Sequence, residues 1–347
     1  PYIHITGASK SLFRIELYDK QKLVYDTTMS SGSYAKIDKK YYTDWRTVIY
    51  KDNLLILDEF INLENKRVYI AIDSAALGDS IAWIPYALEF QQKHKCNVVI
   101  STFKNFLFED VYPELDFIKP GDYAGDIYAK YIIGWFSEDN YHPVAPNTIP
   151  LQQTASDILG LEYKEIKPRI TNNFGNECGM KDNYNVPGKY VTIATNATAG
   201  CKFWTREGWQ EVINFLHSKG YMIVNTSKED NPFDNCEKIV DTDIEYTIDC
   251  IRQSEFFIGL SSGLSWLAWA IGTPVVMISN FTEADHEFSC YRVSDTSICH
   301  GCWNNPKFTF DRGDWDWCPE HKGTDRQFEC HTKIPASKVI STLTMLL

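Results

Sequence analysis

The sequence of 347 residues has no run of 18 or more apolar residues, and it does not open with a basic segment followed by an apolar one. A bilayer-spanning helix requires the first feature and a secretory signal peptide requires the second. Low-complexity segments are missing as well. We therefore expect a cytoplasmic protein with no membrane span and no signal peptide.

Positive charge is also scarce, since 34 lysine and arginine residues face 46 aspartate and glutamate residues and leave a net charge of −12. Nucleic acids and anionic membranes bind clustered positive charge, so we expect neither as a partner. A phosphorylated small ligand needs only one or two cations and some backbone N–H groups, and this composition allows it. With 44% hydrophobic residues, the chain can bury the cores of two ordinary domains or three small ones.

The order of the apolar segments indicates three regions. Residues 1–65 contain short alternating stretches separated by turn signals, which predict a small β-rich N-terminal domain. Residues 66–170 start with a strand, a Gly-containing turn, a helix from residue 80 to 94 and a second strand, which form a βαβ unit. Residues 171–347 repeat this alternation and end in an amphipathic helix. The sequence thus predicts an α/β fold with two Rossmann-like lobes, in which ligands bind beyond the carboxyl ends of the strands.

The first candidate site residue is Asp79, which follows a predicted strand in the run Leu77-Gly78-Asp79-Ser80. An aspartate at a strand-to-helix turn is often simply a helix N-cap. A carboxylate at this edge of the sheet, facing a second lobe, could instead act as general base for an acceptor hydroxyl. The dipeptide alone leaves both interpretations open.

Two further loops have the features of a phosphate site. The run 195–204 follows a strand and places small and hydroxyl residues ahead of Lys202, a pattern typical of a phosphate-binding turn but also of a solvated surface loop. In the second loop, Ser261-Ser262-Gly263-Leu264 opens a helix whose backbone N–H groups can bind an anion. An ordinary N-cap uses the same donors, so the two roles are compatible.

Four of the ten cysteines crowd into 32 residues, at Cys299, Cys302, Cys318 and Cys330. Four thiolates suit a closed tetrahedral structural site for zinc or iron, which has no open position for catalysis. The alternatives are four unrelated buried thiols, or a site in which a nearby histidine replaces one cysteine; the candidates are His300, His321 and His331.

Taken together, these segments resemble the lipopolysaccharide heptosyltransferases. The matching stretches are Leu77-Gly-Asp-Ser-Ile-Ala-Trp-Ile-Pro85, the threonine, lysine and tryptophan of the run 195–204, and the run 263–274. The longer run 261–282 and the cysteine cluster after it narrow the resemblance to the bacterial autotransporter heptosyltransferases, over about residues 66–347. The β-rich N-terminal region also fits that family.

The resemblance implies a glycosyltransferase of the GT-B type. It would transfer heptose, with inversion, from ADP-heptose to serine side chains of an autotransporter adhesin passenger domain. The resemblance further implies iron in a cysteine finger at 299–330, with zinc as the alternative, and no catalytic metal. It also implies a large symmetric homo-oligomer such as a dodecamer.

Carried over residue by residue, the resemblance divides the functional roles between the two lobes. Residues 66–170 become the acceptor lobe, with Asp79 as general base, and residues 171–347 become the donor lobe. Lys202 would neutralise the donor diphosphate. The remaining donor contacts would be two loop hydroxyls and a backbone phosphate cradle, namely Thr195, Thr198, Ser262, Gly263 and Leu264.

The chain departs from the lipopolysaccharide enzymes in the second loop, where they usually have Asp, Thr and His; the residues here are Ser261, Ser262 and Trp266. The ribose contact stays unassigned, although Lys228, Glu229 and Asp230 lie near the expected place. Two other functions remain open. One is a heptosyltransferase for lipopolysaccharide or another small acceptor, and the other is a metal-stabilised scaffold that only binds a nucleotide.

Overall fold

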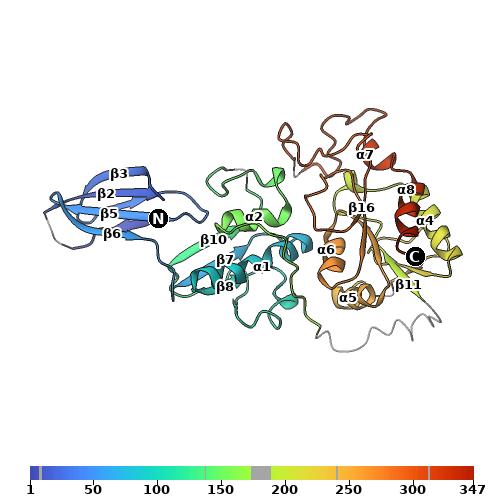
Figure 1. The fold of residues 1–347 in the computed structure, drawn as a ribbon, viewed down its shortest axis with the longest axis horizontal. Coiled ribbons are helices and arrows are strands. Elements are labelled where there is room, and N and C mark those ends of the chain that lie inside the picture. The colour runs from blue at the N-terminus through green and yellow to red at the C-terminus, as the bar shows by residue number, and fades with distance from the viewer. Residues whose placement is uncertain (8–9, 137, 173–188, 240, 312) are drawn as a thin grey trace.

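The computed structural model describes residues 1–347 except 8–9, 137, 173–188, 240 and 312. An antiparallel sheet at the N-terminus and two parallel sheets follow one another along the longest axis of the molecule (Figure 1). Among the described residues, no helix is long and apolar enough to cross a membrane.

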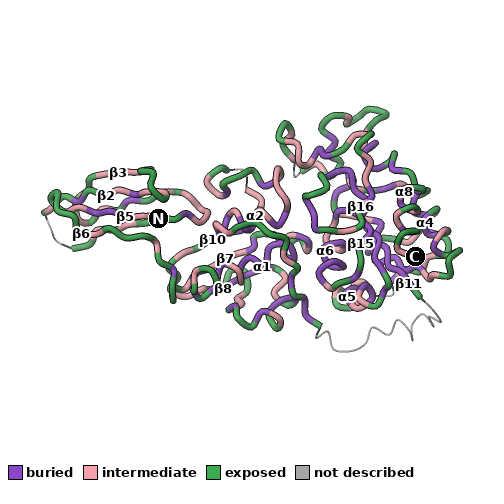
Figure 2. Tube along the Cα trace, viewed as in Figure 1, coloured by how far each residue is buried: buried purple, intermediate pink, exposed green. Residues whose placement is uncertain are grey.

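The N-terminal sheet has four antiparallel strands in the order β3-β2-β5-β6, and a separate short pair joins β1 to β4. Alternate residues of β2, such as Ile15 and Leu17, are buried in a small core, as expected of an antiparallel sheet with one covered face. Much of the rest of this region is exposed (Figure 2). The strands are β1 (Tyr2–His4), β2 (Leu12–Asp19), β3 (Lys22–Ser30), β4 (Tyr34–Lys36), β5 (Trp45–Lys51) and β6 (Leu54–Phe60).

The first parallel sheet has the strand order β10-β7-β8-β9. Its main helix, α1, begins at Leu77, three residues earlier than the sequence indicated. The N-cap position belongs to Ala76, so Asp79 lies inside the first turn and is not the N-cap. The elements are β7 (Arg67–Ile72), α1 (Leu77–His94), β8 (Asn97–Ser101), η1 (Asn105–Leu107), β9 (Asp116–Phe117), β10 (Ala129–Ile133), η2 (Pro146–Thr148) and α2 (Leu151–Ile158).

The second parallel sheet has six strands in the order β13-β12-β11-β14-β15-β16. Alternate residues of its strands belong to two different cores, because helices cover both faces. The elements are β11 (Tyr190–Ile193), η3 (Gly200–Lys202), α4 (Arg206–Ser218), β12 (Met222–Asn225), β13 (Glu237–Lys238), α5 (Ile244–Gln253), β14 (Phe257–Leu260), α6 (Gly263–Ala270), β15 (Val275–Ile278), β16 (Tyr291–Val293), α7 (Glu329–Thr332) and α8 (Ala336–Thr344). The predicted α/β fold with parallel sheets is confirmed.

The two lobes meet where the N-termini of α1 and α6 touch. A Cβ atom on Gly78 would lie 3.1 Å from Trp266 Cδ1, and one on Gly263 would lie 3.0 Å from Leu77 Cβ. Glycine at these two positions therefore allows a close approach that larger residues would hinder. One hydrophobic core continues from the first lobe through this contact into the second.

Candidate functional site

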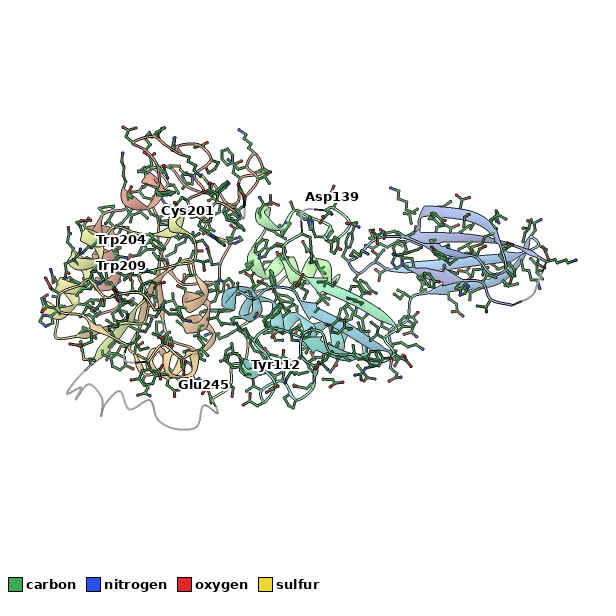
Figure 3. All side chains as sticks on the ribbon, turned by 180° about the vertical axis from the view of Figure 1, so that it is seen from behind. Tyr112, Asp139, Cys201, Trp204, Trp209 and Glu245 are labelled. Carbon is green, nitrogen blue, oxygen red and sulfur yellow. The ribbon has the colours of Figure 1, made fainter. Side chains whose placement is uncertain are left out.

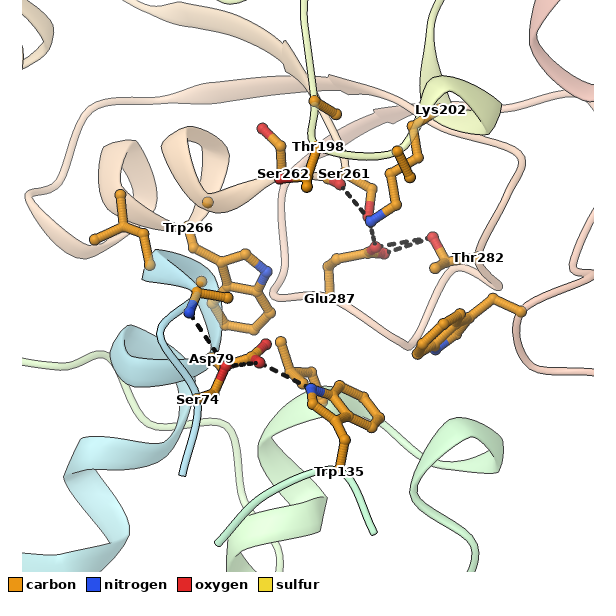
Figure 4. A pocket seen from close by; sticks show the side chains of 18 of the residues that line it. Ser74, Asp79, Trp135, Thr198, Lys202, Ser261, Ser262, Trp266, Thr282 and Glu287 are labelled. Carbon is orange, nitrogen blue, oxygen red and sulfur yellow. Dashed lines mark hydrogen bonds between the residues drawn. The ribbon is translucent and has the colours of Figure 1, made fainter. Parts of the chain in front are cut away.

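A cleft of about 1590 Å³ lies between the two lobes, beyond the carboxyl ends of their strands. Asp79 lines one side, and Thr198, Lys202 and Ser262–Leu264 line the other. Figure 4 shows the two groups facing each other across the cleft. Ligands of open α/β sheets bind at such a crevice.

Asp79 is held in place by two donors from its own lobe. Its Oδ2 accepts a hydrogen bond of 2.6 Å from Ser74 Oγ and one of 2.8 Å from Trp135 Nε1 (Figure 4). Ser74 follows β7 and Trp135 follows β10, so both donors come from the carboxyl ends of neighbouring parallel strands. Two donors on one oxygen fix the rotation of the carboxylate.

The opposite side of the cleft has the features of an anion site. Lys202, at the end of η3, donates from Nζ to the Ser261 carbonyl oxygen at 3.0 Å. Ser262 is the N-cap of α6, and its Oγ is buried with no hydrogen-bond partner among the described residues. A cation, an unpaired hydroxyl and the N–H groups of a helix N-terminus can together bind a diphosphate.

Beside this anion site lies a buried ion pair that sequence reasoning missed, and its carboxylate residue, Glu287, also lines the cleft. The Glu287 side chain is 1% exposed, and its carboxylate accepts from Arg292 Nη1 at 2.5 Å, from Ser261 Oγ at 2.5 Å and from Thr282 Oγ1 at 2.8 Å. Burial alone would raise the pKa of Glu287. The Arg292 guanidinium, together with His286 and the Ser261 hydroxyl, holds that pKa below its ordinary value. This charged carboxylate fixes the loop whose carbonyl binds Lys202.

Two predicted hydroxyls lie in different surroundings. Thr198 is exposed and lines the cleft. Thr195 is buried behind the loop, where its Oγ1 donates to Asn196 Oδ1 at 2.8 Å and its backbone N–H donates to Ser227 Oγ at 2.9 Å, and it is not among the cleft-lining residues. Near the end of β12, Lys228 and Glu229 line the cleft, at the place considered for the ribose.

The four cysteines of the predicted finger surround one small, mostly apolar pocket. Cys201, which precedes Lys202 and is not one of the four clustered cysteines, lines the same pocket, and Figure 3 shows it close to the C-terminal segment that carries the finger. His321 and Glu329 also line the pocket. Their ligand atoms and Cys299 Sγ all lie within 4.8 Å of one another. The four thiols thus line one pocket, but the ligand atoms that lie close enough together to share one ion there are those of Cys299, His321 and Glu329.

Burial raises the pKa of two of the clustered thiols. Burial, and then the charge of neighbouring Cys299, raise the pKa of the Cys302 thiol to about 12. Burial, and then the charges of Cys299 and Cys302, also raise the pKa of Cys330. His331 is fully buried with Nδ1 3.2 Å from Cys330 Sγ, whereas His300 is exposed and contacts the Ile298 carbonyl. Thiols that stay protonated in the absence of a metal lose their protons and become good ligands once a soft metal cation binds between them.

Comparisons with known proteins agree with this geometry. Residues 138–312 match the model of glycosyltransferase family 9 (heptosyltransferase). The autotransporter heptosyltransferase Aah of Escherichia coli is 36% identical over 327 residues, which cover 89% of this chain and 82% of Aah. The inactive autotransporter heptosyltransferase BimC of Burkholderia thailandensis is 30% identical over 337 residues, covering 92% of this chain and 78% of BimC.

A solved structure is similar over nearly the whole chain. TibC, an iron-containing dodecameric glycosyltransferase from enterotoxigenic E. coli H10407, superposes with a TM-score of 0.89 at 30% identity and covers 99% of this chain and 94% of its own. A second TibC structure is a complex with ADP-D-beta-D-heptose. Fold and cleft therefore define a two-lobed glycosyltransferase. The chain belongs to glycosyltransferase family 9 and, within it, to the autotransporter heptosyltransferases.

Proposed function

We propose that the protein transfers heptose from ADP-heptose to serine hydroxyls of an autotransporter adhesin, with Asp79 as the general base. The observation that carries this proposal is the cleft in which a fixed carboxylate faces a lysine and a helix N-terminus. The ADP-heptose complex of TibC and the names of the relatives support the choice of donor and acceptor.

The reaction requires a base on one side of the sugar and a positive field on the other. In the proposed reaction, the serine oxygen attacks the anomeric carbon while Asp79 takes its proton. The bond from that carbon to the diphosphate breaks, and its electron pair leaves with ADP. Lys202 and the N–H groups at Ser262–Leu264 stabilise the negative charge that grows on the leaving group. Because these groups supply the positive electrostatic field, a catalytic metal is unnecessary. The general base contributes roughly 10²–10⁴-fold.

Donor binding follows from the same residues. The diphosphate would lie between Lys202 and the first turn of α6, where the unpaired Ser262 hydroxyl gives it one more donor. Thr198 would add a hydroxyl from the loop that carries Lys202. Thr195, which we assigned to the donor on resemblance, would act through the loop it supports, because it is bonded to Ser227.

A structural metal is part of the proposal. Cys299, Cys302, Cys318 and Cys330 would hold iron, or zinc, and the metal would supply the charge and cross-links that order the segment 299–330. This segment contains little regular structure, and α7 is only four residues long. The iron in TibC supports the choice of metal.

We also propose a homo-oligomer, in line with the dodecamer of TibC. The edge strand β6 exposes Leu54, Leu55, Ile56 and Phe60, with Leu54 71% exposed and Phe60 63% exposed. An exposed apolar edge strand is a common site of chain association.

A cytoplasmic location fits the nine described cysteines, all of which are free thiols.

The decisive experiment compares two acceptors in one assay of ADP release. We expect release with ADP-heptose and an adhesin passenger domain, and only background with lipopolysaccharide core. The reverse preference would favour the small-acceptor enzyme. Because the relative BimC is inactive, activity itself must be shown; ADP binding without release for either acceptor would favour the nucleotide-binding scaffold.

A further inference from the structure

The segment 299–330 reaches the acceptor side of the cleft as well as the donor side. On the donor side, the backbone N–H of Cys201 donates to the Trp315 carbonyl at 3.4 Å. On the acceptor side, Asn304 Nδ2 donates to the Asn147 carbonyl at 2.8 Å and Asn147 Nδ2 donates to the Trp303 carbonyl at 3.3 Å. The finger therefore bridges both lobes at the cleft.

Trp303 contacts the residue that holds Asp79. Its ring stands edge-on to that of Trp135, with centroids 5.3 Å apart and an interplanar angle of 85°. A second ring neighbour of Trp135 is Trp83, whose ring centroid lies 5.8 Å away and whose Nε1 donates to the Leu151 carbonyl at 2.7 Å. Edge-to-face aromatic pairs at these distances are attractive and directional, so Trp135 is held between a first-lobe ring and a finger ring.

Trp303 is itself held in place by its chain neighbour and by a backbone hydrogen bond. It directly follows Cys302, one of the predicted metal ligands, and its backbone N–H donates to the Phe281 carbonyl at 3.2 Å. Its indole Nε1 is buried with no hydrogen-bond partner among the described residues. The contribution of Trp303 is therefore its ring, and phenylalanine could supply much of the same contact.

We propose that Trp303 is a positioning residue that acts through Trp135, whose N–H holds the Asp79 carboxylate, and that it thereby couples the finger to the catalytic centre. This inference rests on the proposed role of Asp79. Losing the ring of Trp303 frees Trp135 to turn, which weakens its 2.8 Å hydrogen bond to Asp79 Oδ2. The orientation of the base then suffers, whereas donor binding on the far side of the cleft does not.

A double-mutant cycle on the full-length protein tests the coupling. Trp303→Leu should lower kcat about tenfold, the lower end of what one hydrogen bond to a charged group contributes, with KM for ADP-heptose and metal content unchanged. Trp135→Phe removes the donor directly and should lower kcat by at least as much. In the Trp135→Phe background, Trp303→Leu should have almost no further effect, because both changes break the same interaction. Trp303→Phe should restore most of the activity.

Two outcomes would overturn the proposal. Reductions in kcat that multiply in the double variant would mean that Trp303 does not act through Trp135. Loss of metal or of ADP affinity in both Trp303→Leu and Trp303→Phe would make Trp303 part of finger stability alone. Asp79→Asn separates this inference from the proposed function. If the Asp79→Asn enzyme is active, Asp79 is not the general base. If it is inactive and the effects in the Trp135 and Trp303 cycle are additive, only the coupling through Trp303 is refuted.

Discussion

Replacing Glu287 by glutamine should both destabilise the donor lobe and weaken donor binding. The substitution keeps the shape of the side chain but leaves the Arg292 guanidinium, with 10% of its side chain exposed, without its counter-charge. Breaking a buried ion pair from one side costs about 3–5 kcal/mol. Because glutamine still accepts a hydrogen bond, we expect the free energy of unfolding to fall by about 3 kcal/mol. This loss is equivalent to a decrease of about 6–12 °C in the melting temperature of a lobe of this size.

The matched control is an exposed pair with similar geometry. Arg46 donates from Nε and Nη2 to the two carboxylate oxygens of Asp58, both at 2.6 Å, on the N-terminal sheet. Water screens that pair, so Asp58→Asn should leave the melting temperature unchanged within error. Circular dichroism melts of the two variants at pH 7, with and without ADP, measure the difference. Equal melting temperatures for Glu287→Gln and wild type would refute the reasoning.

The pH dependence gives a second check with a defined sign. The pKa of Glu287 is lower in the folded than in the unfolded chain, so its charge stabilises the fold fully above the unfolded value of about 4.5. This stabilisation is lost as the pH falls through the lowered pKa. The melting difference between wild type and Glu287→Gln should therefore be largest near neutral pH and shrink below pH 4.5. A constant difference across this range would mean that charge at Glu287 is not the cause.

The remaining predictions concern the donor site and the finger. Lys202→Ala should weaken ADP binding about 10–150-fold by isothermal titration and lower kcat as well, and unchanged values for both would make Lys202 a surface residue. Ser262→Ala should lower ADP affinity about 2–13-fold without changing the melting temperature, because the hydroxyl has no partner among the described residues. Cys318→Ser should abolish metal binding, as measured by elemental analysis, and should make the protein aggregate, whereas Cys236→Ser should have only a mild effect. Wild-type protein that is folded and active without metal would refute the structural metal site.

Local patterns predicted the regular elements of the second lobe well. Helix α4 (Arg206–Ser218), for example, begins where Thr205 Oγ1 accepts from the Gly208 N–H at 3.1 Å, a capping residue of the type that helix starts favour. The continuous apolar strands were recognisable because both faces of this sheet are covered. By contrast, the exposed apolar residues of β6 (Leu54–Phe60) follow no alternation, so only the β-rich character of this region was predicted.

The cleft residues were predicted only where a motif marked them. Asp79, Lys202 and Ser262 follow strands that the apolar pattern indicated, and their chemical roles stay predictions. Trp135 was missed because its strand, β10 (Ala129–Ile133), was not recognised; the rule that ligands bind at carboxyl ends of strands would have led to it. Glu287 had no such signal, since its pairing with Ser261 joins residues 26 positions apart through a loop.

The central claim is that this cleft transfers heptose to protein hydroxyl groups by general-base catalysis from Asp79. The most direct measurement is the intact mass of an adhesin passenger domain incubated with ADP-heptose and either wild type or Asp79→Asn, followed by peptide mapping. The account predicts mass increases of whole heptose units on serines with wild type, and at least a hundredfold less with a folded, ADP-binding Asp79→Asn variant. An unmodified passenger with wild type, or equal modification by both enzymes, would contradict it.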